Sequence, residues 1–352
     1  MSRIESIEVE AHDLPLTESF EFALGTQHSA KNVLVTVRTE TGAVGYGEGT
    51  PISPITGETQ AAALATARAM AELIESEPVE AYRSLHDRID GAFVGMPAAK
   101  VAVETAVVDA YCRERELPLA ELFGNSPSPV VTDVTIPIVS ADVASERAAQ
   151  AVDKGFSHLK IKTGSSVDDD VERILAIADA APDAALKVDA NQGWTPGEAV
   201  EFARRVGSHG VAIELLEQPV PRTDIRGLAH VRRKVDVPIA ADETVFTPSD
   251  AISVIRNEAA DIINVKLGKS GLLDAMAIVS IAQAADLELM IGCMLESAIG
   301  IHTSAHLVAG TGAFSYVDLD GNRLLAEDVI VDKGPTIDID GPGHGVTPTN
   351  NL

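Results

Sequence analysis

The residues of this sequence best suited to chemistry begin with two lysines, Lys160 and Lys162, in an apolar segment that starts at Leu159. Side chains alternate between the two faces of a strand, so residues two apart place both ammonium groups on one face. A buried lysine without a negative partner is destabilising or loses its proton. The pair therefore indicates a charged site on that face, with acidic groups close to it.

Three carboxylates follow at the ends of the next three strand-like segments, at Asp189, Glu217 and Asp242. A single acid at a strand end often caps a helix or closes a loop, but three on successive strands point toward one axis. Buried together, they would repel one another and raise one another's pKa, which a divalent cation relieves. Mg²⁺ prefers oxygen ligands, so these three residues predict a magnesium site.

A third lysine, Lys266, ends the strand-like segment that follows Asp242. In an eight-stranded barrel it would lie about halfway round from Lys160 and Lys162, and would face them across the barrel mouth. Neighbouring positive charges would lower the pKa of one lysine of the pair, which would then be neutral near pH 7. Two lysines on opposite sides of a carbon acid can remove a proton from one side and return it to the other, while Mg²⁺ holds the developing enolate oxygens. The expected reaction is proton abstraction next to a carboxylate.

The elements that must position these residues form a regular series after Pro127. Short apolar strands alternate with helical segments at a spacing of roughly 25 residues, which predicts an α/β protein with a (β/α)8-type barrel, a modified TIM barrel. Active sites of such barrels lie at the C-terminal ends of the strands. The predicted strands are Val134–Val139, Leu159–Lys162, Leu186–Ala190, Ala212–Glu217, Pro238–Asp242, Ile262–Leu267, Glu288–Cys293 and Tyr316–Asp320. The predicted helices are Ala141–Lys154, Val167–Ala180, Pro196–Val206, Asp224–Lys234, Pro248–Arg256, Gly271–Ala284 and Ala298–Ala309.

The chain before this series has a different pattern. Alternating apolar residues predict strands near the N-terminus, and the alanine-rich segments Gln60–Ile74 and Pro97–Cys112 predict helices. The polar, turn-rich segments Leu16–Lys31 and Thr50–Glu58 are predicted to be loops that form a lid. This part of the chain is therefore predicted to be an N-terminal α+β capping domain.

Three regions follow from these patterns. Residues 1–125 would form the capping domain and residues 126–323 the barrel. Residues 324–352 are acidic and rich in glycine and proline, and they lack any apolar periodicity. We expect this last segment to pack back on the capping domain.

The charge of the chain is strongly negative. It carries 53 acidic and 27 basic residues, a net charge of −26, which argues against nucleic acid as a partner because phosphate binding needs a basic surface. The N-terminus lacks the apolar run of a signal peptide and no long apolar span is found, so we expect a cytoplasmic protein without membrane contact. The acidic excess suggests a halophilic protein, because concentrated salt screens self-repulsion.

In the lysine and carboxylate motifs described above, the sequence resembles the enolase superfamily, muconate-lactonizing subgroup. The resemblance covers nearly the whole chain and implies a capping domain over a modified barrel. It also implies Mg²⁺ on Asp189, Glu217 and Asp242, an acid/base pair, and a frequently homo-oligomeric protein. Lys162 and Lys266 would form this acid/base pair. Lys160 would stabilise the enolate and lower the pKa of Lys162. The matching segments are Lys160-Ile161-Lys162, Asp189-Ala190-Asn191-Gln192-Gly193-Trp194, Glu217-Gln218-Pro219, Ala241-Asp242-Glu243, Lys266 and Gly292-Cys293-Met294-Leu295-Glu296-Ser297.

Within this subgroup, Asp318 and Asp320 resemble the Asp-x-Asp of dipeptide epimerases, whose carboxylates receive the α-ammonium group of the substrate. Their spacing of two places both on one side of a strand, although a polar strand end that caps a turn would look the same. The resemblance predicts an isomerase that inverts the α-carbon of the C-terminal residue of a dipeptide by a two-base 1,1-proton transfer. Glu296, Gly25 and Thr26 are predicted to complete the substrate site.

One position departs from the pattern of the enzymes that act on L-Ala-D/L-Glu. Their lid carries an arginine where this chain has Gly25, and glycine cannot pair with a carboxylate. Lys31 and His28 are nearby candidates for that role, but a preference for glutamate is in doubt. Sister activities also stay open: an N-acylamino-acid racemase, an o-succinylbenzoate synthase or a muconate-type cycloisomerase. A non-catalytic metal-binding barrel is the alternative of another class.

Overall fold

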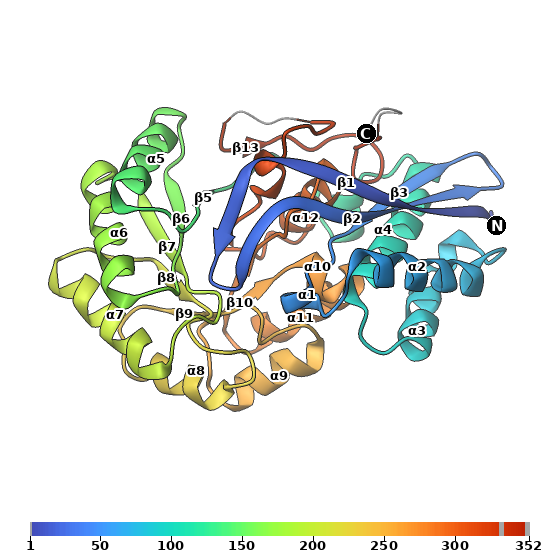
Figure 1. Cartoon of the computed structure of the whole chain (residues 1–352). Helices are drawn as coiled ribbons and strands as arrows, with labels where there is room; N and C mark the ends of the chain where they lie inside the picture. Colours follow the sequence, from blue (N-terminus) through green and yellow to red (C-terminus); the bar gives the residue numbers. More distant parts are fainter. Residues whose placement is uncertain (1, 331–333, 349–352) are drawn as a thin grey trace.

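The computed structural model describes residues 2–330 and 334–348. Its N-terminal part is a three-stranded antiparallel sheet covered by helices (Figure 1). Three valines of β2, at positions 33, 35 and 37, alternate onto the helix-covered face and are completely buried. The strands are β1 (Ile4–Phe22), β2 (Gly25–Thr39) and β3 (Val44–Gly49), and the helices are α1 (Ser53–Thr56), α2 (Gln60–Ile74), η1 (Val79–Ala81), α3 (Tyr82–Ala92) and α4 (Pro97–Glu114).

Strand β3 lies directly against the backbone of α4. A Cβ atom on Gly47 would come within 2.1 Å of the carbonyl oxygen of Ala102. Only glycine permits this approach, so β3 fixes α4 over the sheet and, through it, the position of the capping helices.

The predicted loop at Leu16–Lys31 is wrong, because this segment continues β1 and β2 as a long two-stranded ribbon. Its residues pair across the ribbon, with Phe20 opposite Gln27 and Phe22 opposite Gly25. The pairing satisfies the backbone polar groups that a loop would leave to water. The ribbon extends from the capping domain toward the barrel (Figure 1), and the second predicted loop contains the short helix α1.

The predicted barrel is confirmed as a parallel sheet of eight strands in the order β12-β11-β10-β9-β8-β7-β6-β5. Helices cover the outside of the sheet (Figure 1). The strands are β5 (Val134–Ile136), β6 (His158–Lys162), β7 (Ala185–Asp189), β8 (Leu215–Glu217), β9 (Ile239–Ala241), β10 (Ile262–Val265), β11 (Glu288–Ile291) and β12 (Tyr316–Val317). The helices are α5 (Ala141–Asp153), α6 (Val167–Ala180), α7 (Pro196–Ser208), α8 (Ile225–Arg232), α9 (Pro248–Arg256), α10 (Leu267–Ser270), α11 (Leu272–Ala284) and α12 (Ala298–Thr311).

The two faces of β6 explain how the barrel positions its charged residues. Leu159 and Ile161 are completely buried in the main hydrophobic core. Lys160 and Lys162 alternate with them and therefore point into the barrel. A separate apolar cluster, which includes Leu215 on β8, packs together from five of the strands.

The C-terminal segment contacts both other regions through its described residues. Strand β13 (Thr336–Ile337) pairs with β4 (Val130–Val131), and the N–H of His344 donates to Oδ1 of Asp109 on α4 at 2.9 Å. These contacts agree with a segment that returns to the capping domain. The boundaries 1–125, 126–323 and 324–352 stay a prediction. The remaining short elements are η2 (Leu119–Leu122) and η3 (Gly321–Leu324).

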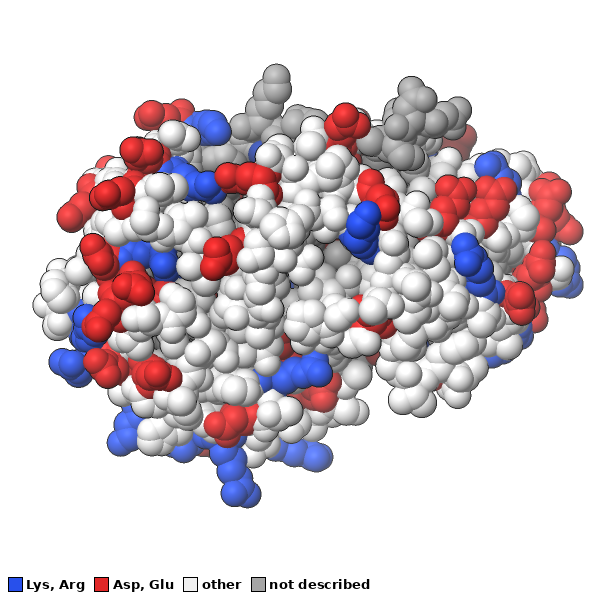
Figure 2. Space-filling view, viewed as in Figure 1, with Lys and Arg blue, Asp and Glu red and all other residues white. Residues whose placement is uncertain are grey.

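Acidic side chains are spread over the face in Figure 2, on both the barrel helices and the capping domain.

In the described residues no helix has the length and apolar character needed to cross a membrane.

Candidate active site

The three acids of the predicted metal site meet at the C-terminal ends of adjacent strands. Asp189 ends β7, Glu217 ends β8, and Asp242 follows β9 directly. One carboxylate oxygen from each lies within 4.8 Å of the others, and all three side chains are buried. The strand order therefore brings together residues that lie far apart in the sequence.

Neighbouring polar groups orient these carboxylates. The N–H of Asn191 donates to Oδ1 of Asp189 at 2.9 Å, and Nδ2 of Asn264 donates to Oε1 of Glu217 at 2.7 Å. The other Glu217 oxygen, Oε2, is buried and lies 2.9 Å from the ammonium nitrogen of Lys160. Three buried acids that offer only oxygen ligands, each within 4.8 Å of the others, fit a Mg²⁺ ion, which prefers oxygen ligands.

The three predicted lysines surround this acidic group. Nζ of Lys162 lies 2.7 Å from Asp189, and Nζ of Lys266 lies 2.7 Å from Asp242. Nζ of Lys160 lies 3.2 Å from Asp189 and 2.9 Å from Glu217. Because β10 lies four strands from β6 in the eight-stranded order, Lys266 approaches the acids from the side opposite the lysine pair.

Burial and mutual charge perturb these groups strongly. Burial, followed by the charge of Asp189, raises the pKa of Glu217 to about 8. Burial also opposes ionisation of Asp242, but Lys266 and Lys269 hold its pKa below its usual value. Lys269 contacts Asp242 at 2.7 Å.

The pKa values of Lys160 and Lys266 shift in the direction opposite to that expected of a general base. Burial disfavours their charged form, yet nearby carboxylates raise the pKa of Lys160 and Lys266, with Asp318 acting most strongly on the first and Asp242 on the second. A divalent cation on the same carboxylates would compete with the lysines for negative charge. The expectation that one lysine of the Lys160/Lys162 pair has a lowered pKa stays a prediction.

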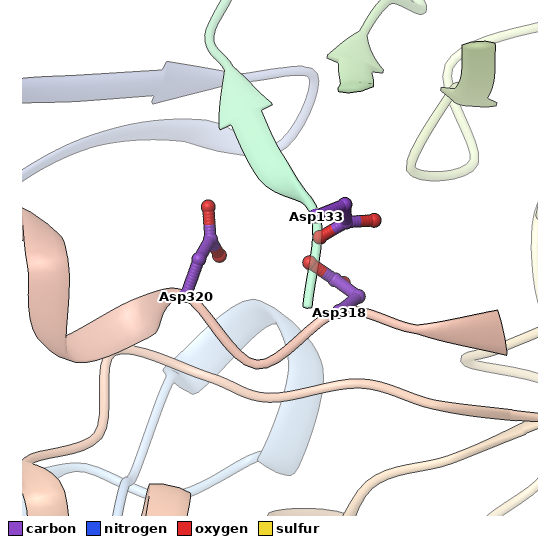
Figure 3. Close-up of side chains that lie close together, drawn as sticks. All are labelled: Asp133, Asp318 and Asp320. Atoms are coloured by element: carbon purple, nitrogen blue, oxygen red, sulfur yellow. The ribbon is translucent and has the colours of Figure 1, made fainter. Parts of the chain in front are cut away.

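A second acidic group lies beside Lys160 and consists of Asp133, Asp318 and Asp320 (Figure 3). One carboxylate oxygen of each lies within 4.8 Å of the others. Oδ2 of Asp318 lies 2.5 Å from Nζ of Lys160, and Oδ2 of Asp320 accepts the N–H of Thr135 at 2.5 Å. The predicted Asp-x-Asp pair is thus brought close to the predicted acid/base lysines.

A cavity lies between the ribbon of the capping domain and this end of the barrel. Lys162 and Lys266 both line it, as do Asp318 and Asp320. Phe20 and other apolar residues form the rest of its wall. The cavity can therefore hold a small molecule in contact with both lysines and the paired acids.

Three residues predicted to bind substrate lie elsewhere. Gly25 and Thr26 are exposed and do not line this cavity, whereas Phe22 and Gln27 of the same ribbon do. Glu296 is buried and lines a separate small space against the capping domain. The register of the ribbon, which the sequence pattern did not indicate, decides the positions of Gly25 and Thr26.

Several residues of the site went unnoticed in the sequence. Asp133 pairs with Lys187, whose Nζ lies 2.9 Å away, and both are buried. Lys187 lies two residues before Asp189, which is a period-two signal of the kind that identified Lys160. Asn264 carries the same signal two residues before Lys266, but no motif marked Asp133.

This fold and this arrangement of side chains define a barrel enzyme that can move a proton next to a carboxylate. Residues 143–352 match the family model described as enolase C-terminal domain-like. Residues 6–124 match the N-terminal domain of mandelate racemase / muconate lactonizing enzyme. The chain belongs to this family of the enolase superfamily.

Known relatives cover almost the whole chain. L-Ala-D/L-Glu epimerase of Thermotoga maritima is 39% identical over 342 residues, which are 97% of this chain and 98% of the relative. Hydrophobic dipeptide epimerase of Enterococcus faecalis is 39% identical over 321 residues, 90% of each chain. A crystal structure of dipeptide epimerase from Enterococcus faecalis, complexed with Mg and the dipeptide L-Leu-L-Tyr, has a TM-score of 0.93 at 37% identity and covers 97% of this chain and 99% of its own.

Proposed function

We propose that this protein is a Mg²⁺-dependent dipeptide epimerase that inverts the α-carbon of the C-terminal residue by a two-base 1,1-proton transfer. The observation that carries the proposal is the cavity that Lys162 and Lys266 line together with Asp318 and Asp320. It combines two amines from opposite sides of the barrel with paired acids suited to an ammonium group. The names of the relatives support the same activity.

Each charged residue of the site has its own role in the proposed reaction. Lys162 removes the α-proton from one epimer, and Lys266 returns a proton to the opposite side of the carbon; the roles reverse for the other epimer. Lys160 remains an ammonium group and stabilises negative charge that develops on the substrate carboxylate. Asp318 and Asp320 hold the α-ammonium group of the dipeptide.

The metal would be held by Asp189, Glu217 and Asp242, and when bound it supplies positive charge next to the substrate carboxylate. The neighbours of these acids limit how they move. Asn264 orients Glu217, and Gln218 accepts the N–H of Asp242 through its side-chain oxygen at 3.0 Å.

The sister activities are less consistent with this cavity. The substrates of an N-acylamino-acid racemase, an o-succinylbenzoate synthase and a muconate-type cycloisomerase lack a free α-ammonium group, so Asp318 and Asp320 would have no cation to bind. A non-catalytic metal-binding barrel would not need Lys162 and Lys266 in one cavity.

The test is incubation of the protein with Mg²⁺ and a library of L,L-dipeptides in D₂O at high salt. We expect deuterium at the α-carbon of the C-terminal residue together with its inversion, both measured by NMR. An absence of exchange across the library, with racemisation of an N-acylamino acid in the same buffer, would contradict the proposal.

We further propose a cytoplasmic, homo-oligomeric protein adapted to high salt. The net charge of −26 and the acidic side chains spread over the surface in Figure 2 support the adaptation to salt, because concentrated ions screen repulsion between such groups. Sedimentation at molar and low salt would measure the oligomeric state, and a monomer at both would contradict that part.

A further inference from the structure

Part of the cavity wall is apolar. Phe20 and Phe22 of the ribbon lie close together, with ring centroids 6.1 Å apart. Phe22 also packs with residues of the capping domain and the barrel in one buried cluster. Five residues of this cluster line the cavity and form its apolar wall: Phe20, Phe22, Ile52, Ile55 and Met294.

The cations that line the cavity are already engaged. Among its described lining residues these cations are Lys162 and Lys266, each 2.7 Å from an acid of the predicted metal site. Lys31, considered above as a partner for a substrate carboxylate, instead lies 2.7 Å from Asp13 and does not line the cavity. His28 is exposed and does not line it either.

The backbone at Gly25, beside the part of the ribbon that lines the cavity, also disfavours a charged side chain at that position. Gly25 pairs with Phe22 across the ribbon and has a φ of +138°. Although no atom lies within 4 Å of where its Cβ would be, that backbone conformation is strained for any residue with a side chain. The nearest position on the same strand that lines the cavity is Gln27, which is uncharged.

We propose that the enzyme prefers dipeptides whose inverted C-terminal residue has an apolar side chain, with Phe20, Phe22, Ile52, Ile55 and Met294 as the specificity-determining wall. This inference rests on the proposed function, because it places the α-carbon between Lys162 and Lys266. An apolar side chain buried there gains from leaving water. A glutamate or aspartate side chain would be buried without a counter-charge, which is strongly unfavourable.

The test compares kcat/KM for L-Ala-L-Leu, L-Ala-L-Met and L-Ala-L-Phe with the values for L-Ala-L-Glu and L-Ala-L-Lys. Each is followed by deuterium exchange at the α-carbon with Mg²⁺ at high salt. We expect the apolar dipeptides to exceed L-Ala-L-Glu by about 10-fold or more, as expected when a charge is left without a partner. An equal or higher kcat/KM for L-Ala-L-Glu would overturn the inferred preference.

A variant at Gln27 tests the wall directly. We expect Gln27→Arg to raise the ratio of L-Ala-L-Glu to L-Ala-L-Leu turnover about 10-fold, because it adds a guanidinium group to the cavity face. Gln27→Met keeps that face neutral and His28→Arg adds the same charge to the exposed face, so neither should raise the ratio. A rise of equal size in His28→Arg would overturn the assignment of the wall.

The outcomes separate the two proposals. Exchange with acidic dipeptides in preference to apolar ones would leave the epimerase function standing and overturn the apolar preference alone. No exchange with any dipeptide would overturn both.

Discussion

Nζ of Lys160 lies 2.5 Å from Oδ2 of Asp318, so one ammonium group joins the two acidic clusters of the barrel. The same Nζ contacts Glu217 at 2.9 Å. Burial opposes ionisation of Asp318, but Lys160 and other lysines lower its pKa to about 2. An ammonium group of a substrate would therefore meet an ionised carboxylate at this place.

Asp318→Asn removes that charge. We expect kcat/KM for L-Ala-L-Leu to fall on the order of 10-fold to 100-fold, mainly through a higher KM, because a hydrogen bond between charged partners is lost. Steady-state kinetics measures the change. The control is competitive inhibition by N-acetyl-L-Ala-L-Leu, which lacks the ammonium group and should bind both proteins almost equally; equal losses for both molecules would contradict the assignment.

The buried pair of Asp133 and Lys187 predicts a loss of stability when one partner is removed. Asp133→Asn leaves the Lys187 ammonium group without its carboxylate and should lower the free energy of unfolding by about 3–5 kcal/mol. Asp133→Asn combined with Lys187→Met removes both charges and should recover most of that loss. Urea unfolding measures the free energy of unfolding of both variants. An Asp133→Asn variant as stable as the unmodified protein would show that the ion pair does not stabilise the fold.

His86 lies between the capping domain and the barrel, with its ring nitrogens 3.6 Å from Glu104 and 3.7 Å from Asp274. Asp274 and Glu104 raise the pKa of His86 to about 10 against the opposing effect of burial. Because the folded pKa exceeds the unfolded value near 6.5, this stabilisation is fully present below pH 6.5 and is lost as the pH rises through about 10.

The difference in free energy of unfolding between the unmodified protein and the His86→Gln variant should therefore become smaller as the pH increases. We expect the unmodified protein to be more stable than the variant at pH 6, and the difference to shrink between pH 7 and pH 10. Urea unfolding at these pH values measures it, and a constant difference would rule out titration of His86.

The acidic surface predicts a dependence of stability on salt. The screening length falls from about 30 Å at 0.01 M salt to about 3 Å at 1 M, so repulsion within a chain of charge −26 is greatest in dilute buffer. Thermal unfolding should occur at a higher temperature in 1 M KCl than in 0.01 M KCl. Identical midpoints would contradict the proposed adaptation to salt.

The barrel and its central charges could be predicted because both depend on local periodicity. Alternation within β6 separates Lys160 and Lys162 from Leu159 and Ile161, and parallel strands gather Asp189 and Glu217 at one end. These relationships need only the period of a strand and the order of the elements.

The lid and the second acidic cluster could not be predicted in the same way. Strands β1 and β2 continue through polar, turn-rich residues because each pairs with the other, and pairing register sends Gln27 rather than Thr26 into the cavity. Asp133 precedes β5 and meets Asp318 after β12, so it becomes part of the site only when the two ends of the sheet approach each other. Such contacts depend on tertiary packing, which periodicity does not encode.

The most direct test of the two-base arrangement is α-proton exchange in D₂O by Lys162→Ala and Lys266→Ala, each supplied separately with L-Ala-L-Leu and L-Ala-D-Leu. We expect epimerisation to fall on the order of 100-fold to 10,000-fold in both variants. Each variant should still exchange the α-proton of one epimer, and the two variants should retain opposite epimers. Epimerisation at the unmodified rate in either variant, or retention of the same epimer by both, would contradict the arrangement.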